Sequence, residues 1–216
     1  MEQAIIDFII VVLGILFALF INRLNEKRKH KARIHSIMNI VVINMNADLA
    51  NIKYVLEDID YKCELFNKLQ KGILMSEEEL KECMNFAIDY PTHTIVKRGY
   101  NLLKDARVDF TFKGSWLISK IILNYDAYLS IFKRHDDLEV KQSAENLRLF
   151  LNLTFSSDYN NNVLSQEIKN YMQTTDYLNM AEYFLYGLRN DYKVHLESYA
   201  DSIVHLLKEI DKSDYK

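Results

Sequence analysis

An apolar run near the start of the chain, residues 4–21, constrains its structure more than any other feature. The run holds eighteen residues and a single charge, Asp7. As a helix it would reach about 27 Å, which is close to the thickness of a bilayer's hydrocarbon core. The sequence therefore predicts one membrane span.

The charges on either side of this run predict its orientation. Only Glu2 and Asp7 are charged before the run ends, whereas basic residues follow it closely: Arg23, Lys27, Arg28, Lys29, Lys31 and Arg33. Because a lysine and arginine excess marks the cytoplasmic side, we expect the N-terminus outside and the rest of the chain in the cytoplasm. The same cluster is suited to contact lipid headgroups. A secretory signal peptide has the reverse order, with its basic residues first.

One face of the predicted span carries small and polar residues at spacings of seven, four and four: Asp7, Gly14, Ala18 and Asn22. Small residues let helix backbones approach closely in lipid, so this face is predicted to pack span against span in a homo-oligomer. The alternative is that glycine and alanine are ordinary residues of a span and that Asp7 lies outside the hydrocarbon core.

The helix is predicted to continue beyond the membrane, because no glycine or proline occurs between Ile15 and Lys71. Apolar residues repeat there every seven positions, at Met38, Met45, Ile52, Ile59 and Phe66. Either later helices of the same chain or the same stripe of a neighbouring subunit must cover them. The first alternative is preferred, because Asp48 and Lys62 interrupt a strict coiled-coil seam.

The sequence pattern of the remaining residues predicts one all-helical domain. Ser76 and Glu79 form a capping-box pattern that starts a helix, and Pro91 ends it. Further helices are predicted over 92–104, from Ser115 onwards, and over 189–210 after a joint at Gly187. The fold class is therefore all-α, with an anchor (1–22), a juxtamembrane long helix (23–72) and a cytoplasmic up-down helical domain (73–216).

Composition excludes several kinds of function. The net charge is −3, and the basic residues are concentrated beside the predicted span, so the chain lacks a general nucleic-acid signature. Cys63 and Cys83 have no zinc-binding spacing, which suits free thiols in a reducing cytoplasm. The sequence shows no pattern for a cofactor or a metal ion.

The anchor resembles the opening of a family of uncharacterised bacterial membrane proteins, whose span ends in a G-I-x-x-A-x-x-I-N-x-x-N-E-x-R-K pattern. The matching residues are Gly14, Ala18, Ile21, Asn22, Asn25, Glu26, Arg28 and Lys29, while Leu24 stands where that family usually has tryptophan. Residues 100–104 and 117–128 are similar to later elements of the same family. This resemblance implies an anchored helical protein in the bacterial inner membrane and no activity.

A second resemblance concerns Arg189, Asn190 and His195, whose spacing is similar to the motif of HEPN domains. Such helical bundles dimerise to form a metal-free ribonuclease site, in which histidine is the general acid or base and arginine stabilises phosphate charge. The motif allows the histidine five to seven positions after the arginine, so Arg28 and His35 match it as well, and such matches are expected by chance. On a regular helix Arg189 and His195 lie about 240° apart. The pair is therefore either a catalytic motif or a surface arginine beside a partly buried histidine.

An anchor joined to a divergent HEPN-like bundle resembles the membrane accessory proteins of type VI-B CRISPR systems. That resemblance implies a homo-oligomer that acts in antiviral defence beside an RNA-guided nuclease or RNA and permeabilises the inner membrane through a pore. Two alternatives stay open at this point. One is a passive scaffold that anchors a cytoplasmic partner, and the other is a membrane-tethered ribonuclease.

Overall fold

The structure is a computed structural model, and it describes residues 2–85, 91–106, 115–154 and 166–213. These residues form helices joined by turns and extended connections and contain no β-strand, which confirms the all-α prediction. The α-helices are α1 (Glu2–Gln70), α2 (Glu77–Asn85), α3 (Arg98–Asp105), α4 (Ser115–Thr154), α5 (Gln166–Met172), α6 (Thr175–Gly187) and α7 (Lys193–Asp211).

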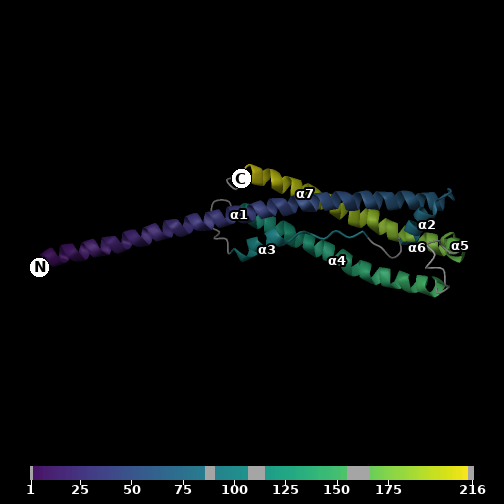
Figure 1. Cartoon of the computed structure of the whole chain (residues 1–216), viewed down its shortest axis with the longest axis horizontal. Helices are drawn as coiled ribbons and strands as arrows, with labels where there is room; N and C mark the ends of the chain where they lie inside the picture. The colour runs from purple at the N-terminus through teal and green to yellow at the C-terminus, as the bar shows by residue number, and fades with distance from the viewer. Residues whose placement is uncertain (1, 86–90, 107–114, 155–165, 214–216) are drawn as a thin grey trace.

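Helix α1 is continuous through the predicted anchor and the juxtamembrane segment, as the absence of glycine and proline from Ile15 to Lys71 predicted. It ends at the expected place, where Gly72 adopts a positive φ of 61° that favours glycine. Among the side chains of α1 that the structure describes, the first buried one is Ile34. The N-terminal part of α1 projects alone, and the other helices lie along its C-terminal part (Figure 1).

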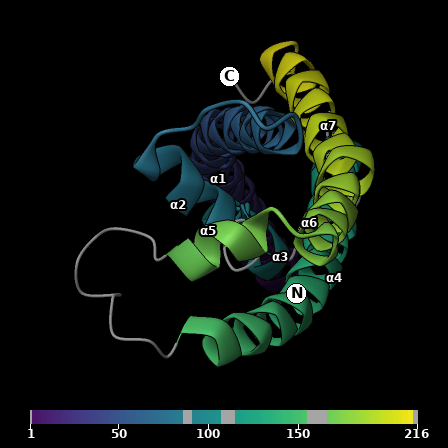
Figure 2. The same cartoon turned by 90° about the vertical axis from the view of Figure 1, so that its right-hand side faces the viewer.

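The seven-residue stripe of α1 forms the centre of the core. All five of its residues, Met38, Met45, Ile52, Ile59 and Phe66, are buried within one chain. Helices α3 and α7 make the most extensive contacts with α1, and α2 adds a smaller contact near its C-terminal end. Figure 2 shows α4 and α7 curving around one side of the bundle. The preferred prediction, that later helices of the same chain cover the stripe, is confirmed.

The predicted helix over 92–104 begins late, because residues 91–97 are not helical and α3 starts at Arg98. Side chains from other elements accept hydrogen bonds from two backbone N–H groups of this connection. The N–H of Val96 donates to Asp48 at 2.8 Å, and the N–H of His93 donates to the hydroxyl of Tyr192 at 2.6 Å. Tertiary hydrogen bonds thus take the place of helical ones at these two amides.

The capping box before α2 is confirmed. The N–H of Glu79 donates to the hydroxyl of Ser76 at 3.2 Å, and the N–H of Ser76 donates to the carboxylate of Glu79 at 2.9 Å. Two amides that would otherwise lack partners are thus satisfied reciprocally.

The predicted joint at Gly187 is wrong. Gly187 has helical φ and ψ of −60° and −44°, and a π-helical turn, Leu188–Tyr192, joins α6 to α7 without a break. The buried residues Phe184, Leu188, Tyr192 and Leu196 follow at steps of four. In a regular α-helix three such steps would turn about 120° too far, but a π-turn takes up more residues and keeps these side chains on the core.

Candidate functional site

The projecting part of α1 exposes large apolar side chains on every side. Those that the structure describes there are about 40–65% exposed: Ile10, Val11, Leu13, Ile15, Leu16, Phe17, Leu19, Phe20, Ile21 and Leu24. Consecutive residues of a helix point in different directions, so packing along one face could not cover them all. Searched over the described residues, no helix contains a stretch long and apolar enough to cross a membrane.

The four residues predicted to pack span against span lie exposed on this projecting helix. The carboxylate of Asp7 accepts a hydrogen bond from Gln3 at 3.2 Å, and the amide of Asn22 donates to Glu26 at 3.4 Å. A Cβ atom added at Gly14 would meet nothing within 4 Å. The face of Gly14 and Ala18 is therefore open to a second helix.

The predicted headgroup cluster lies between the apolar segment and the bundle. Its members are all exposed: Arg23, Lys27, Arg28, Lys29, Lys31 and Arg33. The first buried residue of the core, Ile34, follows immediately. An apolar helix, a basic collar and a packed bundle thus follow one another along α1.

Arg189, Asn190 and His195 each interact with a different residue. The Nε of Arg189 donates to the sulfur of Cys63 on α1 at 2.9 Å, and the amide of Asn190 donates to the carbonyl of Tyr186 at 3.0 Å. The Nε2 of His195 lies 3.1 Å from the carboxylate of Asp191. Within one chain the predicted catalytic pair is therefore not brought to a shared site, and its ribonuclease role stays a prediction about an assembly of two chains.

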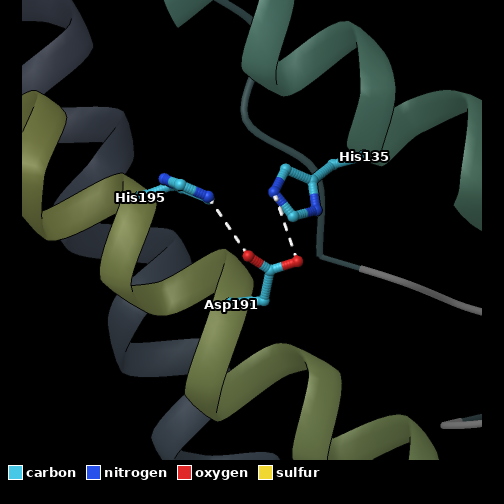
Figure 3. A group of neighbouring side chains, drawn as sticks. All are labelled: His135, Asp191 and His195. Atoms are coloured by element: carbon cyan, nitrogen blue, oxygen red, sulfur yellow. Dashed lines mark ion pairs between the residues drawn. The ribbon is translucent and has the colours of Figure 1, made fainter.

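His195 instead belongs to a cluster that the sequence analysis missed. Figure 3 shows His135 of α4 facing Asp191 and His195, which lie on the π-turn and α7. One nitrogen or oxygen from each side chain lies within 4.8 Å of the other two. The four-residue spacing of Asp191 and His195 is visible in the sequence, whereas His135 joins them only through the packing of α4 against α7.

The cluster lies at the edge of the core and opens to solvent. The side chain of His135 is 9% exposed, that of His195 is 36% exposed, and that of Asp191 is 60% exposed. Burial lowers the pKa of His135 below its usual value, although the charge of Asp191 opposes this effect. His135 is therefore held largely neutral at pH 7, with a nitrogen lone pair available to a ligand.

A second polar cluster is buried around Asp48, which the sequence analysis treated only as an interruption of the seam. Its carboxylate accepts hydrogen bonds from the N–H of Val96 at 2.8 Å and from the hydroxyl of Tyr199 at 3.0 Å. These bonds join α1 to the 91–97 connection and to α7. Burial raises the pKa of Asp48 to about 6, although both hydrogen bonds oppose the shift.

His93 lies beside Asp48, with its Nε2 3.8 Å from the carboxylate. Burial lowers the pKa of His93 to about 4, and neither ring nitrogen has a hydrogen-bond partner among the described residues. The ring forms part of the wall of two hollows, of about 580 and 310 Å³. The second residue that interrupts the seam, Lys62, is buried and lies 3.0 Å from Asp58. Both interrupting charges are thus accommodated within one chain.

Comparison of the chain with known protein families, with curated proteins and with solved structures finds no match.

Proposed function

We propose that the chain is a single-span protein of the bacterial inner membrane, whose projecting helix crosses the bilayer and whose bundle lies in the cytoplasm. The observation that carries the proposal is the exposure of apolar side chains on all sides of the projecting helix. The apolar window begins at Ala4, ahead of the apolar side chains that the structure describes, and ends at Ile21. The described residues from Ile10 onwards make up the larger part of this window.

Ten large apolar residues between Ile10 and Leu24 are exposed. Fully burying one such side chain is worth about 1.5–3 kcal/mol, and these side chains are a little over half exposed, so leaving the segment in water forgoes on the order of 10–20 kcal/mol. A partner helix in water would cover a single stripe, whereas lipid surrounds a helix completely. A bilayer is therefore the environment that fits this surface best.

The basic collar supports the orientation. The basic residues that follow the apolar run, between Arg23 and Arg33, favour the cytoplasmic side of the membrane, so the bundle beyond them should lie in the cytoplasm. About thirteen residues separate Ile21 from Ile34, which amounts to about 20 Å of helix. This length carries the bundle past the headgroup layer, where the collar can contact anionic lipid.

Membrane flotation tests the anchor. Leu16→Arg combined with Phe17→Arg should move the protein from the membrane fraction to the soluble fraction, because charges at the centre of a span are costly. Ile43→Arg is the matched control, since Ile43 is equally exposed but lies on the bundle part of α1. A C-terminal reporter should be active only in the cytoplasm. Flotation that survives the double substitution would refute the anchor.

The activity we propose is that of a homo-oligomeric effector or accessory of antiviral defence that permeabilises the membrane. Its support is the open face of Gly14 and Ala18, together with the resemblance to CRISPR accessory proteins. Gly14→Leu with Ala18→Leu should reduce both the oligomer size in detergent and dye leakage from vesicles. Val12→Leu with Leu16→Phe adds bulk to the opposite face and should leave both unchanged. Equal leakage from the two double variants would refute a role for this face.

Two alternatives are distinguished by further measurements. A passive scaffold would bind its partner at the membrane and cause no leakage at any concentration. A tethered HEPN-type ribonuclease would cleave RNA, and Arg189→Ala or His195→Ala would abolish that cleavage without changing oligomer size. The separate partners of Arg189 and His195 within one chain favour neither cleavage nor a shared site.

A further inference from the structure

We propose that His135, Asp191 and His195 bind a divalent first-row transition-metal ion of the zinc class. The inference goes beyond the membrane function and does not depend on it. It rests on three side chains whose ligand atoms all lie within 4.8 Å of one another, with His135 and His195 on either side of the Asp191 carboxylate (Figure 3).

The distances in the cluster are close to those of a metal site. Ligand atoms bound at about 2.0–2.1 Å in a tetrahedral site lie about 3.3 Å from one another. The Nε2 of His195 is 3.1 Å from Oδ1 of Asp191, and the Nε2 of His135 is 4.0 Å from Oδ2 of the same carboxylate. One edge of the site is therefore already at ligand spacing. The ligand atoms of the three side chains lie within 4.8 Å of one another, so the other edges need to shorten by up to about 1.5 Å. Rotation of the exposed side chain of Asp191 and the partly exposed side chain of His195 can supply this shift.

The ligand chemistry selects the metal class. Two imidazoles and one carboxylate suit zinc and also ferrous iron, for which a facial triad of this composition is characteristic. Magnesium and calcium prefer oxygen ligands, so two histidines disfavour both ions. The exposure of Asp191 leaves room for water or a substrate in the remaining coordination positions.

The backbone supports the arrangement. Asp191 lies in the π-turn and His195 one turn later in α7, so both project from one side of the same continuous helix. π-turns within α-helices are frequent at functional sites. The ring of His135 packs edge-on against Tyr192 with centroids 5.1 Å apart, which fixes its direction from α4. A bound ion would tie α4 to α7 at this point.

The first experiment measures binding to full-length protein in detergent, purified without a polyhistidine tag and stripped with a chelator. We expect calorimetry to detect one equivalent of zinc and no magnesium. Cobalt added as a probe should give visible absorption bands of a protein-bound ion, and zinc should displace it. Zinc should outcompete anaerobic ferrous iron for the site, and displacement of bound zinc by ferrous iron would contradict the zinc assignment. Absence of a one-to-one zinc complex would overturn the proposal.

Variants localise the site. Asp191→Asn alters an exposed side chain and His195→Gln a partly exposed one, so both variants should fold, and each should weaken zinc binding at least tenfold. His135→Gln should do the same, with its folding checked by circular dichroism. The matched control is His205→Gln, because His205 also pairs with a carboxylate four residues away, Glu209 at 3.3 Å, but has no third ligand among the residues that the structure describes. Zinc should also raise the melting temperature of the wild type but not of the Asp191 or His195 variants. Zinc affinity equal in the control and in the site variants would show that the cluster is only a set of ion pairs.

Discussion

Asp48 and His93 lie side by side in the core. Protonation of Asp48 should stabilise the fold, whereas protonation of His93 should destabilise it. The folded pKa of Asp48 is raised from 3.8 to about 6, and that of His93 is lowered from 6.5 to about 4. Burial causes both shifts, because it disfavours the charged form of either group. Tyr125 and Tyr199, which also face Asp48, stay neutral in this range since burial raises the pKa of each further.

The two pKa shifts make the free energy of unfolding change with pH in opposite directions. The raised pKa of Asp48 contributes stability that is fully present below about pH 4 and is lost as the pH rises through 6. The lowered pKa of His93 contributes stability that is present above about pH 6.5 and is lost as the pH falls through 4. Each shift is somewhat over two pKa units, or about 3 kcal/mol. Between pH 4 and 6 the two contributions nearly cancel in the wild type.

Single substitutions should expose each contribution. Relative to Asp48→Asn, the wild type should gain about 3 kcal/mol of unfolding free energy between pH 7 and pH 4. Relative to His93→Gln, it should lose about 3 kcal/mol over the same range. Urea unfolding followed by circular dichroism at several pH values measures both differences, and the remaining titrating groups cancel in the comparison. A difference that stays flat with pH for either variant would refute the burial argument for that residue.

Three further predictions follow from single residues. Gly99→Ala should destabilise the fold by about 1–3 kcal/mol in thermal unfolding, because the added Cβ would lie 2.8 Å from the backbone of Val41. At Gly187 an added Cβ would meet nothing within 4 Å, so Gly187→Ala should stabilise the helix by about 0.5–1 kcal/mol in the same assay. Cys83 should resist alkylation until the protein unfolds, since its thiol is buried and its pKa is raised to about 12; fast labelling of native protein would contradict this. Ser76→Ala should lower the unfolding free energy by about 1 kcal/mol through the lost cap, and an unchanged value would show that the cap contributes little.

The parts of the fold that depend on local rules could be predicted from the sequence. The continuity of α1 beyond Gly14 follows from the absence of glycine and proline between Ile15 and Lys71, and its end follows from Gly72. The capping box at Ser76 is likewise a short-range pattern. The connection at 91–97 could not be predicted, because tertiary hydrogen bonds from Asp48 and Tyr192 replace the helical bonds that local propensity favours. Gly187 was misread for a similar reason, since core packing carries the helix through it.

The candidate sites show the same division. Asp191 and His195 share a helix at a spacing that could have been noticed, but His135 is fifty-six residues from Asp191 and joins them only when α4 packs on α7. Asp48 was treated as an interruption because a charge within an apolar repeat has no partner visible in sequence. Its partners come from residues 96 and 199, which lie far away in the chain.

The packing of α1 also limits how copies of this protein could associate. The seven-residue stripe from Met38 to Phe66 is buried by the chain's own helices, so a coiled coil through that stripe would require opening the core. The apolar surfaces that α1 leaves available are the projecting segment and, on the bundle part, isolated side chains such as Ile43 and Tyr54. Scattered single residues of this kind are ordinary on protein surfaces, whereas the projecting segment is continuous. A homo-oligomer that associates through α1 and leaves each bundle intact would therefore use the part of the helix that we propose to lie in the membrane, and the face of Gly14 and Ala18 is where close approach costs least.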